Sequence, residues 1–317
     1  MTEIRSILVA TDLTESSDEV VRAAAELAAA RDAELHVLHA FDFPAVATTG
    51  KDVPAASFQG RIEAAERKLD EQLGRTLPEG AKAASRRVEI YVAHRAIVEV
   101  AEGVGADLIV LGPHSKRAGD GILGSTADRI VRSASVPCLI VRGTLSLPVR
   151  RIVVPLDLSD PGLGALEVGL AWGVALGGHD DAATGTEVIV LHVVPRVFET
   201  PDFPFDRAVI GPELHREVEA ARQRVRGATE LEVTEEVRWG ETPADEIVKM
   251  AAEEGADLLV LGTHGHGVVK RALIGSVASG VARRAPCPVL LVPPAMLRPG
   301  AAGDAPDDRV EAGAPGS

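Results

Sequence analysis

Cysteine is scarce in this chain, and its scarcity excludes a secreted domain held together by disulfides. The 317 residues include two cysteines, Cys138 and Cys287, whereas such frameworks are built from several pairs. Each cysteine adjoins a proline and an apolar segment, so we interpret both as buried structural thiols. Thiols of this kind are typical of a reducing compartment, and we therefore expect a cytoplasmic protein.

Positive charge and long apolar runs are also in short supply. Lysine and arginine total 33 against 47 aspartates and glutamates, a formal net charge of −14. Nucleic-acid-binding proteins carry a basic patch or stripe, so we expect no nucleic-acid partner, although a local basic site is not excluded. No apolar run approaches the ~20 residues that cross a bilayer, and no signal-peptide pattern precedes the first strand. We therefore expect no membrane association.

Familiar catalytic patterns are missing as well. The sequence has no nucleophile elbow, no HExxH and no acidic cluster with metal-ligand spacing, so we assign no catalytic residue and no metal site. Residues 119–126 resemble a Walker-type phosphate loop, but Ser125 stands where the lysine should follow the last glycine, and we discount the match. These absences favour ligand binding over catalysis.

The most informative feature that is present is a repeat. Residues 107–112 read Asp-Leu-Ile-Val-Leu-Gly and residues 257–262 read Asp-Leu-Leu-Val-Leu-Gly. Each copy continues into a glycine-containing loop and then Gly-Ser, at Gly124-Ser125 and Gly275-Ser276. A length of 317 residues and a hydrophobic content of 46% fit two globular domains, each able to bury its own core. The repeat therefore predicts two similar domains, 1–145 and 149–294.

Strand and helix patterns alternate through both halves. Near-continuous Val/Ile/Leu strands between amphipathic helices are typical of a parallel sheet covered on both faces. We predict an α/β fold of two tandem five-stranded parallel open sheets, followed by a disordered tail over 295–317. The expected strands are 6–12, 34–40, 87–93, 107–112, 138–142, 151–157, 187–194, 231–239, 257–261 and 288–292. The expected helices are 17–30, 57–77, 97–105, 125–133, 163–176, 213–227, 243–254 and 276–284.

Several polar groups should meet where the strands of each half end. Ligands of open parallel sheets bind at the carboxyl ends of the strands, where Asp12 and Asp157 end the first strand of their halves. Backbone N–H groups at a helix start suit a phosphate, and Gly-Ser stands at such a start in both halves. Positive charge against a polyphosphate could come from four residues of the second loop: His264, His266, Lys270 and Arg271.

Each of these features also has a plainer interpretation. Asp12 and Asp157 could cap the following helices, Ser16 or Ser17 could cap the first one, and Gly-Ser is a common helix start. His264 and His266 could be exposed loop residues. Structural roles are expected for His36, His39 and His192 on strands, and solvated helix faces for the charged runs 63–71 and 213–226.

At this point the sequence resembles the universal stress protein family. Its nucleotide-binding members carry the pattern Gly-x2-Gly-x9-Gly-(Ser/Thr), which Gly262, Gly265, Gly275 and Ser276 match in full. The strand-end Asp157 and two further segments, 191–193 and 237–243, strengthen the match. The resemblance covers both halves, so the chain looks like a tandem member with a Rossmann-like, adenine nucleotide alpha hydrolase-like fold.

The resemblance implies ATP with Mg²⁺ as the ligand of the second half. Asp157 and Val193 would line the adenine and ribose end, Gly262 would lie near the ribose, and Gly265, Gly275 and Ser276 would hold the phosphates. The complete expected set is Pro155, Asp157, Val193, Gly262, His264, Gly265, Gly275, Ser276 and Val277.

The first half departs from the pattern. Ser115 replaces the second glycine, the loop to Gly124 is one residue shorter, and the Val-x-x-Gly turn is missing. Serine resists a positive φ, so we expect this half to bind nucleotide weakly or not at all. Its degenerate set is Asp12, Ala40, Gly112, His114, Gly124, Ser125 and Thr126.

The function implied is that of a stress-response protein with ATP as a regulatory or sensing ligand. The alternatives are an interaction or structural protein with neither site filled, and an enzyme, either a slow ATPase or an adenylyl transferase. Against adenylyl transfer, no HxGH signature follows the first strand of either half. The halves should pair as an internal pseudo-dimer through their closing strands, and a homodimer of whole chains stays open.

Overall fold

The computed structural model describes residues 4–41, 55–113, 123–177, 185–195, 207–264 and 274–294. Strands and helices alternate through them as predicted. The first half contains β1 Ser6–Thr11, α1 Asp18–Arg31, β2 Glu34–Phe41, α2 Ala55–Thr76, β3 Ser85–Ile90, α3 Ala93–Gly103, β4 Leu108–Leu111, α4 Ser125–Ser133 and β5 Cys138–Ile140. The second contains β6 Arg151–Pro155, α5 Asp160–Leu176, β7 Glu187–Pro195, α6 Arg207–Arg224, β8 Glu232–Gly240, α7 Pro243–Glu253, β9 Leu258–Gly262, α8 Ser276–Arg284 and β10 Val289–Val292. Short 3-10 turns, η1 Glu15–Ser17 and η4 Ala228–Glu230, precede α1 and β8.

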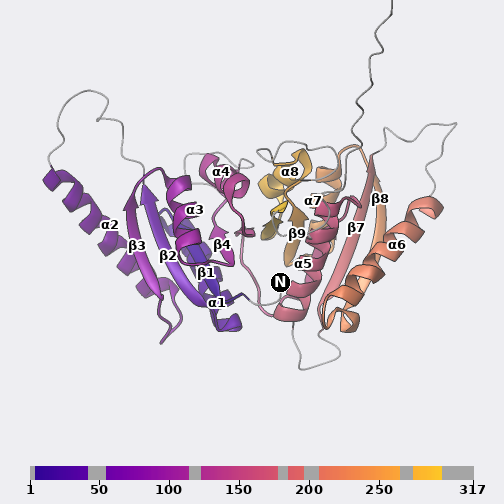
Figure 1. Ribbon diagram of the computed structural model, residues 1–317, viewed down its shortest axis with the longest axis horizontal. Helices are drawn as coiled ribbons and strands as arrows, with labels where there is room; N and C mark the ends of the chain where they lie inside the picture. Colours follow the sequence, from indigo (N-terminus) through magenta and orange to yellow (C-terminus); the bar gives the residue numbers. More distant parts are fainter. Residues whose placement is uncertain are drawn as a thin grey trace, which may run out of the picture.

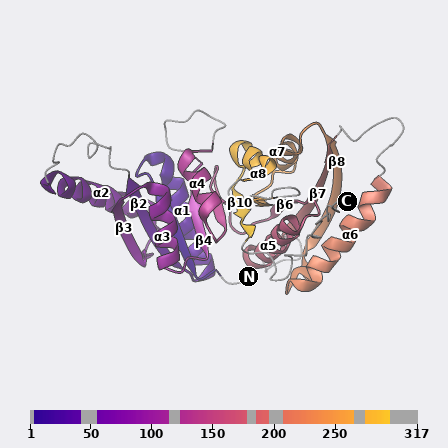
Figure 2. The ribbon, with the colours of Figure 1, turned by 45° about the horizontal axis from the view of Figure 1, so that its top comes forward.

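The ten strands form one sheet. Their order is β3-β2-β1-β4-β5-β10-β9-β6-β7-β8, parallel within each half and antiparallel where β5 meets β10, with Leu139 opposite Leu290. The α/β class and the two five-stranded parallel sets are therefore confirmed. The closing strands pair as expected, and their pairing merges the two sets into one sheet. The ends of the molecule are formed by β3 with α2 and by β8 with α6 (Figures 1 and 2).

Each face of the sheet has its own core, and both cores run through the two halves. Side chains of a strand alternate between faces. Val9 and Val154 accordingly belong to a core covered by α1, α2, α5 and α6, whereas Leu8 and Leu259 belong to one covered by α3, α4, α7 and α8. All four side chains are fully buried. Apolar burial, the main favourable contribution to folding, is thus shared between the halves.

Several predicted boundaries are wrong, most of all those of α3 and α6. The third strand ends at Ile90 and α3 begins at Ala93, because the helical spacing of Ala96, Ile97 and Val100 brings three buried side chains onto one face. The helix expected from 213 begins at Arg207. Proline commonly stands at a helix start, but Pro212 lies inside α6.

The two thiols are buried, as predicted. Cys138 is 1% exposed and Cys287 is 6% exposed, and both are free cysteines. Burial raises the pKa of each thiol to about 12, so neither is a thiolate near neutral pH. Among the helices of the described ranges, none combines the length and apolar character required to span a bilayer.

Candidate functional site

A cavity of about 570 Å³ opens in the second half, where β6, β7 and β9 end. Every predicted residue of this half that lies in the described ranges lines it, while Gly265 lies outside them. Gly162 and Ile247, which the sequence interpretation missed, also line it, together with Leu191 and Pro243 from the two segments that strengthened the family match. The predicted residues that line the cavity are Pro155, Asp157, Val193, Gly262, His264, Gly275, Ser276 and Val277.

Asp157 is held at the cavity by the turn that follows β6. Its Oδ1 accepts hydrogen bonds from the backbone N–H (3.1 Å) and the hydroxyl of Ser159. Ser159, not Asp157, then caps α5 by accepting the N–H of Gly162 at 3.2 Å. Leu158 between them has a φ of +61°, a conformation that is costly for a leucine and that recurs at functional sites. The turn leaves Asp157 exposed and able to accept further hydrogen bonds.

Two glycines bring the end of β9 against the neighbouring helix starts. A Cβ at Gly262 would lie 2.9 Å from the carbonyl oxygen of Pro161 and 3.2 Å from that of His264, so no side chain fits there. The N–H of Gly275 donates to the Thr263 carbonyl at 2.8 Å, which ties the start of α8 to the end of β9. No side chain of the described residues caps α8, so its first N–H groups are available to an anion at the cavity.

His264 is half-buried, and the exposed loop position considered for it is wrong. Its Nδ1 lies 2.9 Å from the hydroxyl of Thr263, and its buried Nε2 has no hydrogen-bond partner among the described residues. Burial lowers the pKa of the ring, so His264 is neutral near pH 7 and supplies no positive charge. His266, Lys270 and Arg271, the other expected sources of charge, lie outside the described residues.

The strand histidines have structural partners, as predicted. The Nδ1 atom of His39 lies 2.9 Å from the Thr11 carbonyl oxygen, and that of His192 lies 2.8 Å from the Leu156 carbonyl oxygen. Both contacts join the second strand of a half to the end of its first strand. His36 pairs through Nδ1 with the hydroxyl of Ser85 at 2.8 Å.

The first half has a corresponding cavity of about 320 Å³. Asp12 is held as Asp157 is: its Oδ1 accepts the backbone N–H of Thr14 at 3.0 Å and the Thr14 hydroxyl at 2.6 Å. Leu13 has a φ of +59°, which matches Leu158. His114 lies outside the described residues. The predicted residues that line this cavity are Asp12, Ala40, Gly112, Gly124, Ser125 and Thr126.

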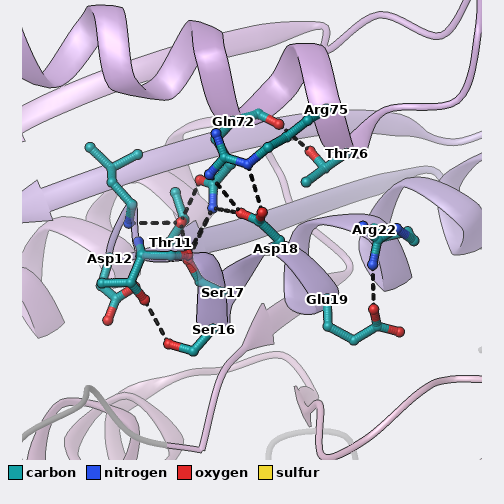
Figure 3. A network of polar contacts seen from close by, with 12 residues as sticks. Thr11, Asp12, Ser16, Ser17, Asp18, Glu19, Arg22, Gln72, Arg75 and Thr76 are labelled. Atoms are coloured by element: carbon teal, nitrogen blue, oxygen red, sulfur yellow. Dashed lines mark hydrogen bonds and ion pairs between the residues drawn. The ribbon is translucent and has the colours of Figure 1, made fainter.

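A buried polar network beneath the first cavity was not foreseen. The side chain of Gln72 in α2 is fully buried and binds three side chains that lie between the end of β1 and the start of α1 (Figure 3). Its Oε1 accepts from Thr11 at 2.7 Å, and its Nε2 donates to Ser17 at 3.0 Å and to Asp18 at 2.7 Å. Ser17 therefore joins this network instead of capping α1 with its side chain. A glutamine in helical spacing with the apolar Leu69 is the sequence signal that could have revealed it.

The residues next to the strand-end aspartate of each cavity account for part of the difference between the two cavities. Thr11 and Ser17 of the first cavity correspond in the repeat to Leu156 and Gly162 of the second. Ser17 thus carries a side chain where Gly162 has none, and in the second half the carboxylate of Asp157 lies against that position.

The comparisons with known proteins agree with this architecture. The model of the universal stress protein family matches residues 3–142 and again residues 148–293. The chain belongs to the universal stress protein family. The two matches, one after the other, make it a tandem member.

Relatives of full and half length are both found. A universal stress protein of Mycolicibacterium smegmatis is 28% identical over 91% of this chain and 97% of the relative. Universal stress protein A homolog 1 of Coxiella burnetii is 35% identical over 43% of this chain and 95% of the relative. The crystal structure of a universal stress protein from Archaeoglobus fulgidus has a TM-score of 0.64 and 22% identity, with 92% of this chain and 97% of that chain covered. The last likeness shows the shared fold.

Proposed function

We propose that this universal stress protein binds ATP in the cavity of the second half and uses it as a regulatory ligand. The observation that carries the proposal is the meeting of Asp157, Gly262, Gly275 and Ser276 around one cavity of about 570 Å³. Two lie at strand ends and two at a helix start, and they match the nucleotide-binding pattern of the family at every described position.

The cavity offers different surroundings to the two ends of a nucleotide. Leu191, Val193 and Ile247 provide an apolar wall for a base, and Asp157 beside it can accept hydrogen bonds from an amine or from ribose hydroxyls. The start of α8 offers N–H groups and the positive end of a helix dipole, both of which suit phosphates. The hydroxyl of Ser276 can add a further donor.

Magnesium would accompany the phosphates. The described residues contain no group of three or more His, Cys, Asp or Glu side chains able to hold a metal ion by themselves. Mg²⁺ characteristically binds through one or two carboxylates together with substrate phosphates and water. Asp157 is the one carboxylate among the described residues lining the cavity, so the triphosphate and water would supply most of the oxygens that the ion needs.

The second half is proposed as the main site. Its cavity is larger, and the carboxylate of Asp157 lies against Gly162, where the first half has the side chain of Ser17. The chain would comprise two universal stress protein domains, 1–145 and 149–294, in the cytoplasm, with one functional nucleotide site, in the second domain.

Binding without turnover is the proposal. Hydrolysis needs a positioned water and groups that stabilise charge on the transferred phosphoryl, and the described residues that line the cavity include no lysine or arginine to stabilise it. The competing functions are an interaction protein with neither cavity filled and a slow ATPase.

Equilibrium dialysis of the whole chain with labelled ATP and Mg²⁺ tests the proposal. We expect saturable binding of one nucleotide, lost in Gly275→Val, and no phosphate release over hours. Absence of binding at millimolar ATP would favour the interaction protein, and steady phosphate release that stops in Gly275→Val would favour the ATPase. Nucleotide released from purified protein by heat denaturation gives an independent check.

A further inference from the structure

The second-half cavity is bordered by the first turns of two helices. Gly162 in the first turn of α5 lines one side, and Ser276 at the first position of α8 lines another. The orientation of both helices therefore sets where Asp157, packed beside Gly162, and the N–H groups of α8 lie. A contact that fixes the C-terminal end of either helix therefore also affects the position of the groups that line the cavity.

Both far ends are held by arginines of the first half. Arg31 donates a hydrogen bond to the carbonyl of Ala175 in α5 at 3.0 Å. Arg142 donates from Nε to the carbonyl of Ala282 in α8 at 2.9 Å. Each contact joins the two halves of the chain, and both arginines are half-buried.

These carbonyls are ones that a helix cannot satisfy by itself. The last four carbonyls of a helix have no intrahelical partner, and Ala175 and Ala282 each lie within the last four residues of their helix. Neighbouring carbonyls in the same last turns are satisfied within the second half, since Gly177 donates to Gly173 and Ala285 to Val281. A guanidinium at the negative end of the helix dipole adds electrostatic stabilisation.

The second half has no arginines at the corresponding positions to hold helices of the first half. Arg31 is the last residue of α1, and its counterpart at the end of α5 is Leu176. Arg142 lies two residues beyond Ile140, which pairs with Leu111; by the same register its counterpart is Pro293. Leucine and proline have no side-chain donor, so these positions of the second half cannot hold α1 or α4 in the same way.

We propose that Arg31 and Arg142 are positioning residues for the second-half site, through which the first half sets its affinity for nucleotide. The proposal rests on the proposed function. A helix moves nearly as a rigid rod, and ligand groups need placement to within about 0.5 Å. Ala282 lies about 9 Å along α8 from Ser276, whereas Ala175 lies about 20 Å along α5 from Gly162, at about 1.5 Å per residue. We therefore expect Arg142 to affect the nucleotide affinity of the second-half site more than Arg31 does.

Calorimetric titration of the whole chain with Mg-ATP tests the proposal. We expect Arg142→Ala to weaken binding about two- to fivefold, the range of a cation at a helix C-terminus, and Arg31→Ala to weaken it less. Arg142→Lys should restore most of the affinity. The matched control is Arg222→Ala, which removes hydrogen bonds to the carbonyls of Ala228, Thr229 and Leu231 away from the cavity and should leave the ATP affinity unchanged.

Equal affinities for Arg142→Ala and the unaltered chain would overturn the proposal, and so would an equal loss in Arg222→Ala, which would indicate general loosening. If the unaltered chain binds no ATP, the proposed function fails on its own, and amide hydrogen exchange decides the positioning role. Faster exchange at residues 279–282, whose amides lie beyond the unpaired first turn of α8, in Arg142→Ala but not in Arg222→Ala would support that role, and unchanged exchange would refute it.

Discussion

Gly162 lies directly against the carboxylate of Asp157: a Cβ at Gly162 would stand 2.6 Å from Oδ1 of that side chain. The carboxylate can swing away, but it would then lose its hydrogen bonds to the backbone and hydroxyl of Ser159. The contact links the backbone of α5 to the polar group at the mouth of the cavity. The contact also means that a single methyl group added at position 162 would displace the carboxylate of Asp157.

Gly162→Ala should therefore separate binding from stability. Alanine favours a helix over glycine by up to ~1 kcal/mol, which offsets the displaced carboxylate, so unfolding in urea should change little. ATP affinity should fall about tenfold, because hydrogen bonds to charged groups contribute ~1.5–3 kcal/mol. Calorimetry measures the affinity. Gly74→Ala in α2, where a Cβ meets no atom within 4 Å, is the control and should leave binding intact.

The two strand-end glycines should respond differently to alanine. At Gly262 a Cβ meets backbone oxygen at 2.9 Å, whereas at Gly112 it meets only the side chain of Val20 at 3.3 Å. Backbone cannot yield as a side chain can, so Gly262→Ala should cost ~1–3 kcal/mol of unfolding free energy and Gly112→Ala less. Urea denaturation monitored by circular dichroism compares the pair. Equal losses would contradict the difference in packing.

The network around Gln72 predicts a pH dependence of stability. Burial alone would raise the pKa of Asp18, but hydrogen bonds from Arg75 and Gln72 outweigh it, and the pKa lies below its ordinary value of 3.8. Folding then favours the ionised form: the stabilisation is present above 3.8 and is lost as the pH falls through the lowered pKa of the folded state.

Arg75→Ala should therefore reduce the loss of unfolding free energy as the pH falls below about 3.8, and Asp18→Asn should remove this contribution. Urea denaturation at several pH values measures it. Arg86→Ala is the control, since Arg86 pairs with Asp70 where both side chains are largely exposed, and exposed pairs contribute little. A pH profile unchanged by Arg75→Ala would show that the ion pair to Asp18 is not coupled to folding.

The shared cores predict that the two halves unfold together. Leu139 in β5 is fully buried and lies opposite Leu290 of the second half. Leu139→Ala should cost ~2–5 kcal/mol and lower the midpoint reported by Trp172, a buried residue of α5 in the other half. The fluorescence and circular-dichroism transitions should coincide. A tryptophan signal that stays in place would mean that the halves unfold independently.

The sequence was sufficient to predict the elements and the main cavity, because both depend on local patterns. Strand hydrophobicity, the repeated strand-end aspartates and the glycine spacing each identify a position without knowledge of the rest of the fold. The sequence predicted that α3 begins at residue 97 and α6 at residue 213. In the structure α3 begins at Ala93, and α6 includes Pro212. Both predictions were wrong because tertiary packing outweighed local preference.

Other features depend on contacts between distant segments. Gln72 lies 61 residues from Thr11, and Arg142 lies 140 residues from Ala282, so no local pattern pairs them. The closeness of Gly162 to Asp157 likewise needs the turn at Leu158, whose positive φ is not expected of a leucine.

The antiparallel contact of β5 with β10 also has a consequence for how the protein behaves on dilution. A chain half as long could complete such a sheet only by association of two molecules, which mass action would undo at low concentration. Here a short linker keeps the two strands at a high effective concentration. Because the two halves are covalently joined, each half pairs with the other half of the same chain and not with an identical copy of itself. The two halves can therefore diverge in function.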